Sequence, residues 1–245
     1  MFSSSRFAGW SAIASAAVGI AITPFMAAVW AYEPGVVWDD LSLLARTVGP
    51  TLESWGVLSF GAVREMASDG TVLSESIAYE VYGKSFFLVY LLMLPMVRYV
   101  HVRYRQSSDS KLEGRTWRVL WVTLIVATVA DAVSYWGISL PGQLGDSLWG
   151  GGFGVEILAV LVVLVASTVY GAVSIRLRVV PLWASVLLAA IIPVAVATLV
   201  GVTTYVPNAV VVPMSIIWAA VGVWVLATPQ KQLALLDSQR ATTHP

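Results

Sequence analysis

Residues 158–169 read LAVLVVLVASTV, a run without a charged side chain. Transmembrane β-strands alternate apolar and polar residues over about 10 positions, whereas this run is apolar on every side. The span extends to about Val155 and Ile175, with Glu156 at its edge. About 20 predominantly apolar residues are what a helix needs to cross about 30 Å of hydrocarbon. The run therefore predicts a transmembrane helix.

Five further segments meet the same length criterion. The composition agrees with them, because 58% of the residues are hydrophobic and 11% are charged, against about 45–50% and about 25% in soluble proteins. We predict an all-α integral membrane protein: a six-helix transmembrane bundle formed by one domain, residues 1–227, followed by a cytoplasmic tail, residues 228–245. The predicted spans are about 9–32, 81–100, 117–138, 155–175, 179–202 and 209–227.

The basic residues predict the orientation of the bundle. Lys and Arg are enriched in short cytoplasmic connections, and most of the 14 basic residues fall on one side of the six-span arrangement. We therefore predict cytoplasmic termini, an external 33–80 connection and a plasma membrane of the bacterial type. The basic residues on the predicted cytoplasmic side are Arg6, Arg98, Arg103, Arg105, Lys111, Arg115, Arg118, Arg176, Arg178, Lys231 and Arg240.

The first apolar segment allows a second interpretation. The chain begins with MFSSSR, which is followed by an apolar stretch and by Val29-Trp30-Ala31. This order is similar to a secretory signal with its cleavage site. The apolar run exceeds the usual 7–15 residues of a signal core, so we favour a retained helix. Cleavage of residues 1–31 would leave five helices in the same orientations.

The 33–80 connection combines acidic residues with interspersed apolar ones. Asp39 or Asp40 is a candidate N-cap for a short helix that Gly49-Pro50 would end, and Thr51 for a second one. We favour two amphipathic helices on the outer membrane face or capping the bundle. The alternative is an acidic vestibule that gathers cations or a basic partner.

Two other connections have informative compositions. The 98–118 connection is predicted to be cytoplasmic and is rich in basic residues, so it is a candidate for contacts with anionic lipid, although the orientation rule alone also requires such residues. The outer connection between the third and fourth spans is predicted to be flexible, because it is rich in proline and glycine: Pro141, Gly142, Gly145 and the glycine run 150–152.

A polar stripe marks the third span. Asp131 lies within it, and a charge near the centre of a span is penalised by at least about 2.5 kcal/mol, so the side chain should face the bundle interior, find a partner or be protonated. Thr128 and Tyr135 share its helix face at spacings of three and four. Lys84 and Glu156 are expected near the outer ends of their helices, where Lys84 could pair with either acid. The site is then either an ion pair that fixes helix packing or a proton or cation relay.

Catalytic motifs are absent from the sequence. His101 is expected at a cytoplasmic helix end and His244 at the C-terminus, cysteine is missing, and no HExxH, GxSxG or P-loop pattern occurs. No catalytic, metal or cofactor site is therefore predicted. Prolines in the second and fifth spans, Pro95 and Pro193, give a weak hint of a transport site.

Two functions remain open. We favour a non-enzymatic membrane-embedded interaction or accessory component, and the alternative is a small transporter or channel with a proton or cation path through Asp131, Glu156 and Lys84. The expected partners are the lipid bilayer and a membrane protein or a second copy of the chain, to which the small residues Ser11, Ser15 and Gly19 could offer a close approach. With zero net charge, nucleic acid is not expected.

Overall fold

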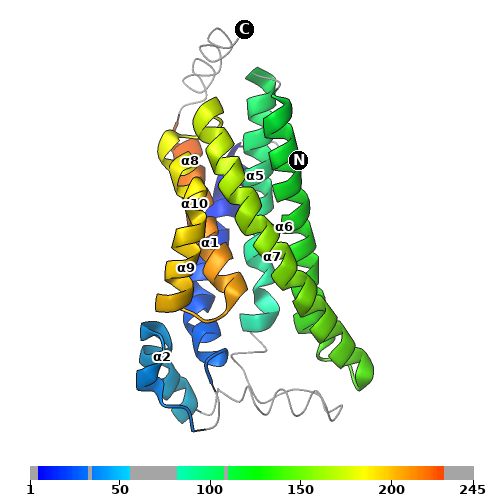
Figure 1. Cartoon of the computed structure of the whole chain (residues 1–245), viewed down its shortest axis with the longest axis vertical. Helices are drawn as coiled ribbons and strands as arrows, with labels where there is room; N and C mark the ends of the chain where they lie inside the picture. Colours follow the sequence, from blue (N-terminus) through cyan, green and yellow to red (C-terminus); the bar gives the residue numbers. More distant parts are fainter. Residues whose placement is uncertain (1–4, 33–34, 56–81, 108–109, 229–245) are drawn as a thin grey trace.

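The computed structural model describes residues 5–32, 35–55, 82–107 and 110–228. These residues form helices and the turns between them, and they contain no strand. Five helices are long and apolar enough to cross a membrane, and the bent pair α8–α9 offers a sixth crossing. For the residues that the structure describes, this confirms the prediction of an all-helical fold with several helices long and apolar enough to span a membrane (Figure 1). The long helices are α1 (Ser5–Val29), α5 (Phe87–Ser107), α6 (Lys111–Gly137), α7 (Gln143–Leu177) and α10 (Val206–Ala227), and the bent pair is α8 (Leu182–Ala189) with α9 (Ile191–Gly201).

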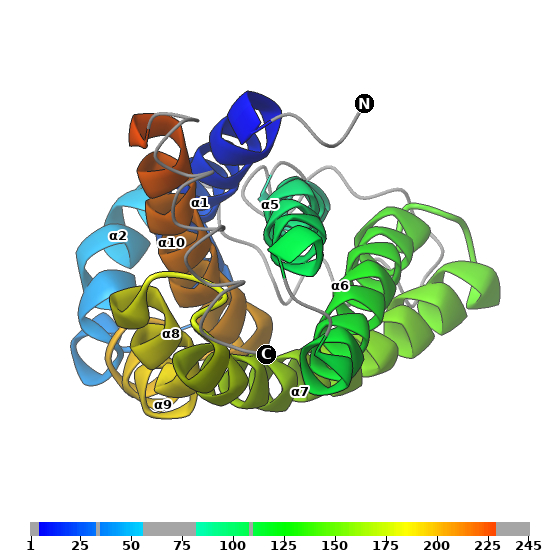
Figure 2. The ribbon, with the colours of Figure 1, turned by 90° about the horizontal axis from the view of Figure 1, so that it is seen from above.

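The helices pack around α5. Viewed from above, α5 lies between α1 and α6, while α10 packs along α1 and α6 along α7 (Figure 2). The first turns of α1 meet the last turns of α10, since a Cβ added to Gly222 would lie 2.9 Å from the carbonyl oxygen of Gly9. The start of α1 and the end of α10 therefore lie at the same end of the bundle.

The small residues of α1 are used within the bundle. Ser11 and Ser15 donate hydrogen bonds to the backbone of α5, at 2.5 Å and 2.6 Å from the carbonyl oxygens of Leu92 and Val89. A Cβ added to Gly19 would lie 3.2 Å from the side chain of Val212 on α10. This face therefore lets α5 and α10 approach α1 closely.

The glycine run at 150–152 is helical, and the prediction of a flexible connection there was wrong. α7 begins at Gln143, directly after Gly142 with φ +68°, so it includes the whole run. Gly152 lies against α6: an added Cβ would be 2.8 Å from the amide nitrogen of Ser134 and 3.0 Å from the carbonyl oxygen of Ala130. Close helix packing outweighs the low helix propensity of glycine here.

The predicted fifth span, 179–202, is two helices rather than one. α8 and α9 meet at Ala190 and are bent by 59°. Pro193 lies in the first turn of α9, so it has no amide hydrogen to donate to the carbonyl group of Ala189, and its ring opposes a continuous helix. The fifth span is thus broken next to its proline, whereas Pro95 lies inside the unbroken α5.

The 33–80 connection has one α-helix among its described residues, α2 (Leu43–Ser54), after a 3₁₀ turn, η1 (Trp38–Asp40). Its N-cap is Ser42, which accepts a hydrogen bond from the Ala45 amide at 3.3 Å and donates one to the Val202 carbonyl group at the end of α9. The prediction of Asp39 or Asp40 as the N-cap was therefore wrong. The predicted end at Gly49-Pro50 was also wrong, because Gly49 packs against the Trp38 ring and the helix continues to Ser54. Residues 56–80 lie outside the described residues.

Candidate functional site

Two acidic side chains meet inside the bundle. Asp131 comes from α6 and Glu156 from α7, and both are 0% exposed. Their carboxyl groups lie within electrostatic range of each other. Glu156 was expected at the edge of its helix, but α7 begins at Gln143, so Glu156 lies about 20 Å along the helix at 1.5 Å per residue. The extended α7 therefore brings Glu156 to the depth of Asp131.

Three tyrosines surround Glu156. Tyr90 of α5 donates its hydroxyl hydrogen to the Oε1 atom of Glu156 at 2.9 Å. Tyr205, just before α10, lies with its hydroxyl oxygen 3.1 Å and 3.2 Å from the two carboxyl oxygens. Tyr135 of α6 donates to the Tyr205 hydroxyl at 2.8 Å. The carboxyl group thus accepts hydrogen bonds from α5 and from the residue that precedes α10, and a chain of hydroxyl groups leads from it to α6.

Asp131 is held much less firmly than Glu156. Neither of its carboxyl oxygens meets the distance and angle requirements of a hydrogen bond to a described residue, although the carboxyl group lies close to that of Glu156 and to the Phe87 backbone. A buried polar group without a partner is costly, typically about 1–3 kcal/mol and more when it is charged. The Asp131 carboxyl group can therefore change its protonation state or its partner, whereas the neighbouring Glu156 carboxyl group is fixed by hydrogen bonds.

Aromatic rings pack against the two tyrosines that bind Glu156. Trp30 stacks on the Tyr205 ring with centroids 4.7 Å apart, and Phe153 stacks on Trp30 at 5.4 Å. Phe86 meets the Tyr90 and Tyr205 rings edge-on, at 5.4 Å and 5.7 Å. These rings add apolar surface near the buried carboxyl groups, and a low local dielectric strengthens the electrostatic interactions between such groups.

The other two predicted site residues lie apart from this cluster. Thr128 is buried on the same face of α6, but its hydroxyl donates to the Leu124 carbonyl group of its own helix at 2.7 Å. Lys84, in the 3₁₀ turn η2 (Gly83–Ser85), places its Nζ atom 2.5 Å from the Ser139 hydroxyl and 5.6 Å from the centroid of the Trp136 ring. The structure brings Asp131, Glu156 and Tyr135 together, with Lys84 near the end of α6.

A second buried pair was missed by the sequence analysis. Glu113 of α6 is 0% exposed, and its carboxyl oxygens lie 2.9 Å and 3.0 Å from the Nδ1 atom of His101 on α5. The His101 ring stacks on Trp117 at 3.8 Å. A Ser-x-x-Glu pattern beginning at Ser110 signals the start of a helix, and Ser110 does accept a hydrogen bond from the Glu113 amide at 3.4 Å. That pattern locates Glu113 but does not reveal its side-chain partner.

Among the residues that the structure describes, no group of three or more His, Cys, Asp or Glu side chains is placed to hold a metal ion. Comparisons with protein-family models, with curated proteins and with solved structures find no match for the chain. A fold alone does not define an activity, so function has to be argued from the buried site.

Proposed function

We propose that this chain is a small plasma-membrane transporter or channel that moves protons, with Asp131 and Glu156 as the proton-binding groups. The observation that carries the proposal is the juxtaposition of two fully buried carboxyl groups inside membrane-spanning helices. Two adjacent negative charges in a low-dielectric bundle repel each other and lose their hydration, so a proton on one of them removes most of that cost. A pair of this kind binds a proton and exchanges it with water when water reaches the site.

The polar groups around the pair favour a proton over a metal cation. Tyr90 and Tyr205 both direct hydroxyl hydrogens toward Glu156. A metal cation needs oxygen lone pairs directed at it, from carboxylates, carbonyl groups or water. Hydroxyl donors instead stabilise an ionised carboxylate after its proton has left.

The tyrosine chain suggests a direction for proton movement. Tyr135 lies four residues after Asp131, about 6 Å farther along α6 toward the end where Lys84 contacts Ser139. Its hydroxyl is linked through Tyr205 to Glu156. Hydrogen-bonded hydroxyl groups polarise one another and can pass a proton in steps. In the proposed topology, with both termini cytoplasmic, this end of the bundle faces outward.

The accessory function expected from the sequence is the second candidate, and the full burial of the acid pair favours it. A sealed pair that never meets water would only fix the packing of α6 on α7. In that case the chain would act through a partner protein, and substitution of the acids would change stability without affecting any flux.

Proton flux in proteoliposomes separates the two candidates. The full-length protein is reconstituted with a pH-sensitive dye inside the vesicles, and a pH gradient is imposed. We expect the wild type to dissipate the gradient and Glu156→Gln to abolish that flux. Asp146→Asn is the matched control, because Asp146 is an exposed acid on the same helix. An inactive wild type, or equal flux in Glu156→Gln and wild type, would overturn the proposal.

A further inference from the structure

His101 and Glu113 form a buried pair at the end of the bundle where α5 ends and α6 begins. Glu113 is 0% exposed and His101 is 8% exposed. The His101 Nδ1 atom lies 2.9 Å from a Glu113 carboxyl oxygen, which is a hydrogen-bond distance. An imidazole changes its charge near neutral pH, and a neighbouring carboxylate favours the protonated form. The pair therefore consists of two groups that can hold and release a proton.

The Trp117 ring is placed to stabilise a protonated His101. The two rings stack with their centroids 3.8 Å apart and their planes 7° from parallel. The Trp117 indole nitrogen donates a hydrogen bond to the Val97 carbonyl oxygen at 3.2 Å, which fixes the indole against α5. The face of an aromatic ring attracts a cation that lies over it. An imidazolium at His101 would thus meet a carboxylate at its edge and an indole on its face.

The pair lies near one boundary of the membrane, far from the Asp131–Glu156 pair. Glu113 is in the first turn of α6, between the exposed Lys111 and Arg115. Asp131 follows 18 residues later, so the two acids are about five turns and about 27 Å apart on α6. The hydrocarbon of a membrane is about 30 Å thick. The two buried sites are therefore separated by most of that thickness, and both acids lie on the same face of α6.

Two buried hydroxyl groups of α7 adjoin the pair. Tyr170 and Ser174, which are one turn apart, are both 0% exposed. The Tyr170 hydroxyl lies close to the Glu113 carboxyl group and to the Ser174 hydroxyl, although neither hydroxyl meets the distance and angle requirements of a hydrogen bond to a described residue. A hydroxyl group both donates and accepts hydrogen bonds. These two can therefore rearrange around Glu113 when its protonation state changes.

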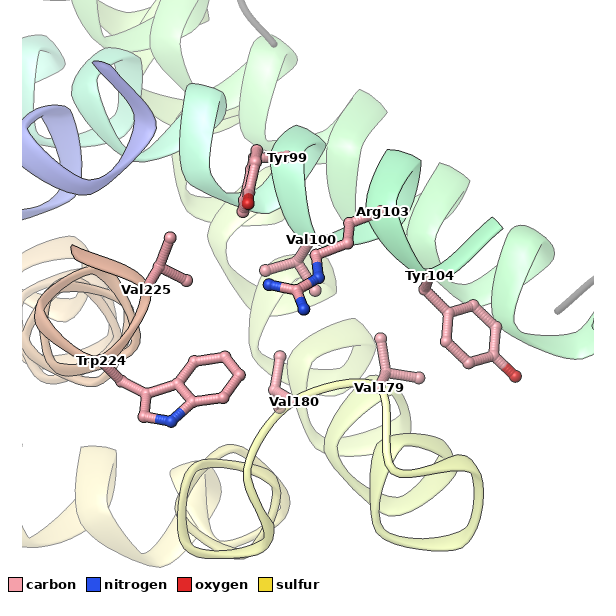
Figure 3. Close-up of a pocket in the computed structure, with 8 residues that line it drawn as sticks. All are labelled: Tyr99, Val100, Arg103, Tyr104, Val179, Val180, Trp224 and Val225. Carbon is pink, nitrogen blue, oxygen red and sulfur yellow. The ribbon is translucent and has the colours of Figure 1, made fainter. Parts of the chain in front are cut away.

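Other titratable or charged groups around the pair come from α5. Figure 3 shows the Tyr104 hydroxyl pointing away from the pocket into which the neighbouring Arg103 is directed. Tyr104 lies within electrostatic range of the Tyr170 hydroxyl. The Arg105 guanidinium group lies beside α6, 4.0 Å from where a Cβ added to Gly114 would be. α8 and α10, which pack against α7, carry no titratable side chain.

Buried apolar side chains of α5, α6 and α7 occupy the bundle interior between the two sites. They include Met93 and Val97 of α5, Leu120 and Leu124 of α6, and Val163 of α7, each 0% exposed. An apolar layer of this kind blocks ions until water enters it. Each site therefore exchanges protons with its own side of the layer.

We propose that His101 and Glu113 form a second proton-binding site, which exchanges protons with the water at this end of the bundle. The inference rests on the proposed proton transport, in which this site is the cytoplasmic counterpart of the Asp131–Glu156 pair. Uptake of one proton converts a neutral imidazole beside the Glu113 carboxylate into an imidazolium, and its release restores the neutral ring. His101 is the member that meets water, because it alone of the two is partly exposed.

Nitrogen NMR tests proton uptake without any transport measurement. The chain has two histidines, so His244→Gln leaves His101 as the single one. In the full-length protein with isotope-labelled histidine, the ring signals should change from imidazolium to neutral imidazole over a range from about pH 4 to pH 10. Adding Glu113→Gln removes the carboxylate, so less imidazolium should be present at each pH. A ring that stays in one form, or a response that Glu113→Gln leaves unchanged, would refute the site.

Proton flux in proteoliposomes tests the role of the pair in transport. We expect Glu113→Gln to reduce the flux about tenfold or more, and His244→Gln, the control, to keep the wild-type flux. The double variant His101→Gln/Glu113→Gln replaces the pair by two amides, which can bond to each other but cannot exchange a proton. It should regain thermal stability lost in Glu113→Gln, but not the flux.

The outcomes separate this inference from the proposed function. If Glu113→Gln conducts as the wild type does, or if the double variant regains flux together with stability, the pair only fixes the packing of α5 on α6 and the inference is refuted. A wild type that conducts no protons would refute the proposed function and the transport role of this pair. The NMR titration would then still decide whether the pair binds a proton.

Discussion

Alanine at Gly152 should destabilise the bundle, although alanine is the better helix former. The added Cβ would lie 2.8 Å from the Ser134 amide nitrogen and 3.0 Å from both the Ser134 Cα atom and the Ala130 carbonyl oxygen. All three atoms belong to the α6 backbone, which cannot rotate away as a side chain can. α6 and α7 must therefore separate by several tenths of an ångström along their contact.

The magnitude follows from two opposing effects. Overpacking of this kind costs about 1–3 kcal/mol, and replacing glycine in a helix returns up to about 1 kcal/mol. We expect a net loss of about 1–2 kcal/mol for Gly152→Ala. In a protein of this size that corresponds to a decrease in Tm of roughly 2–8 °C, measured by tryptophan fluorescence of the purified protein in detergent.

Gly151→Ala is the matched control. Gly151 occupies the preceding position of the same helix, and a Cβ there would meet no atom within 4 Å. Its Tm should remain unchanged or increase, because only the helix propensity changes. If the two alanine variants shift Tm equally, the close approach of α7 to α6 at this point is wrong, and with it the depth assigned to the acid pair.

Three further predictions concern other contacts. Tyr205→Phe removes the hydroxyl that joins the buried glutamate to the tyrosine chain, so it should lower the free energy of unfolding by about 1–3 kcal/mol and slow proton flux; unchanged stability would contradict these hydrogen bonds. His101→Ala leaves the buried carboxyl group of Glu113 without its histidine partner and should lower the free energy of unfolding by about 3–5 kcal/mol. Adding Glu113→Gln should restore part of that stability, whereas a double variant whose loss equals the sum of the two single losses would argue against the pair. The chain has no cysteine, so single cysteines can report its orientation. A membrane-impermeant thiol reagent should label Thr47→Cys in intact cells and Lys111→Cys only after permeabilisation. Labelling of both variants in intact cells would refute the proposed orientation.

The sequence predicted the class of fold because lipid imposes a simple rule on it. Long apolar runs such as residues 158–169 must form helices that satisfy their own backbone hydrogen bonds in lipid. Asp131 was identified for the same reason, since a charge inside such a run is visible without any knowledge of packing. Its neighbour Tyr135 followed from helical spacing.

The position of Glu156 could not be predicted, because it depends on where α7 begins. Glycines usually indicate a flexible connection, and only the close contact of Gly152 with α6 makes them helical here. Tyr90 gave no signal either, since one tyrosine in an apolar helix is ordinary. The pairing of His101 with Glu113 depends on how α5 packs against α6, which local patterns do not contain.

The central claim is that the buried acid pair takes up and releases a proton, and infrared spectroscopy of the protein in lipid observes this directly. A protonated carboxyl group has a carbonyl stretch that an ionised one lacks. Spectra recorded over a range of pH should show such a band changing in the wild type and in Asp146→Asn, and changing with a different pH dependence in Glu156→Gln and in Asp131→Asn. A band that is missing from the wild type, or one that both substitutions of the pair leave unchanged, would contradict the account.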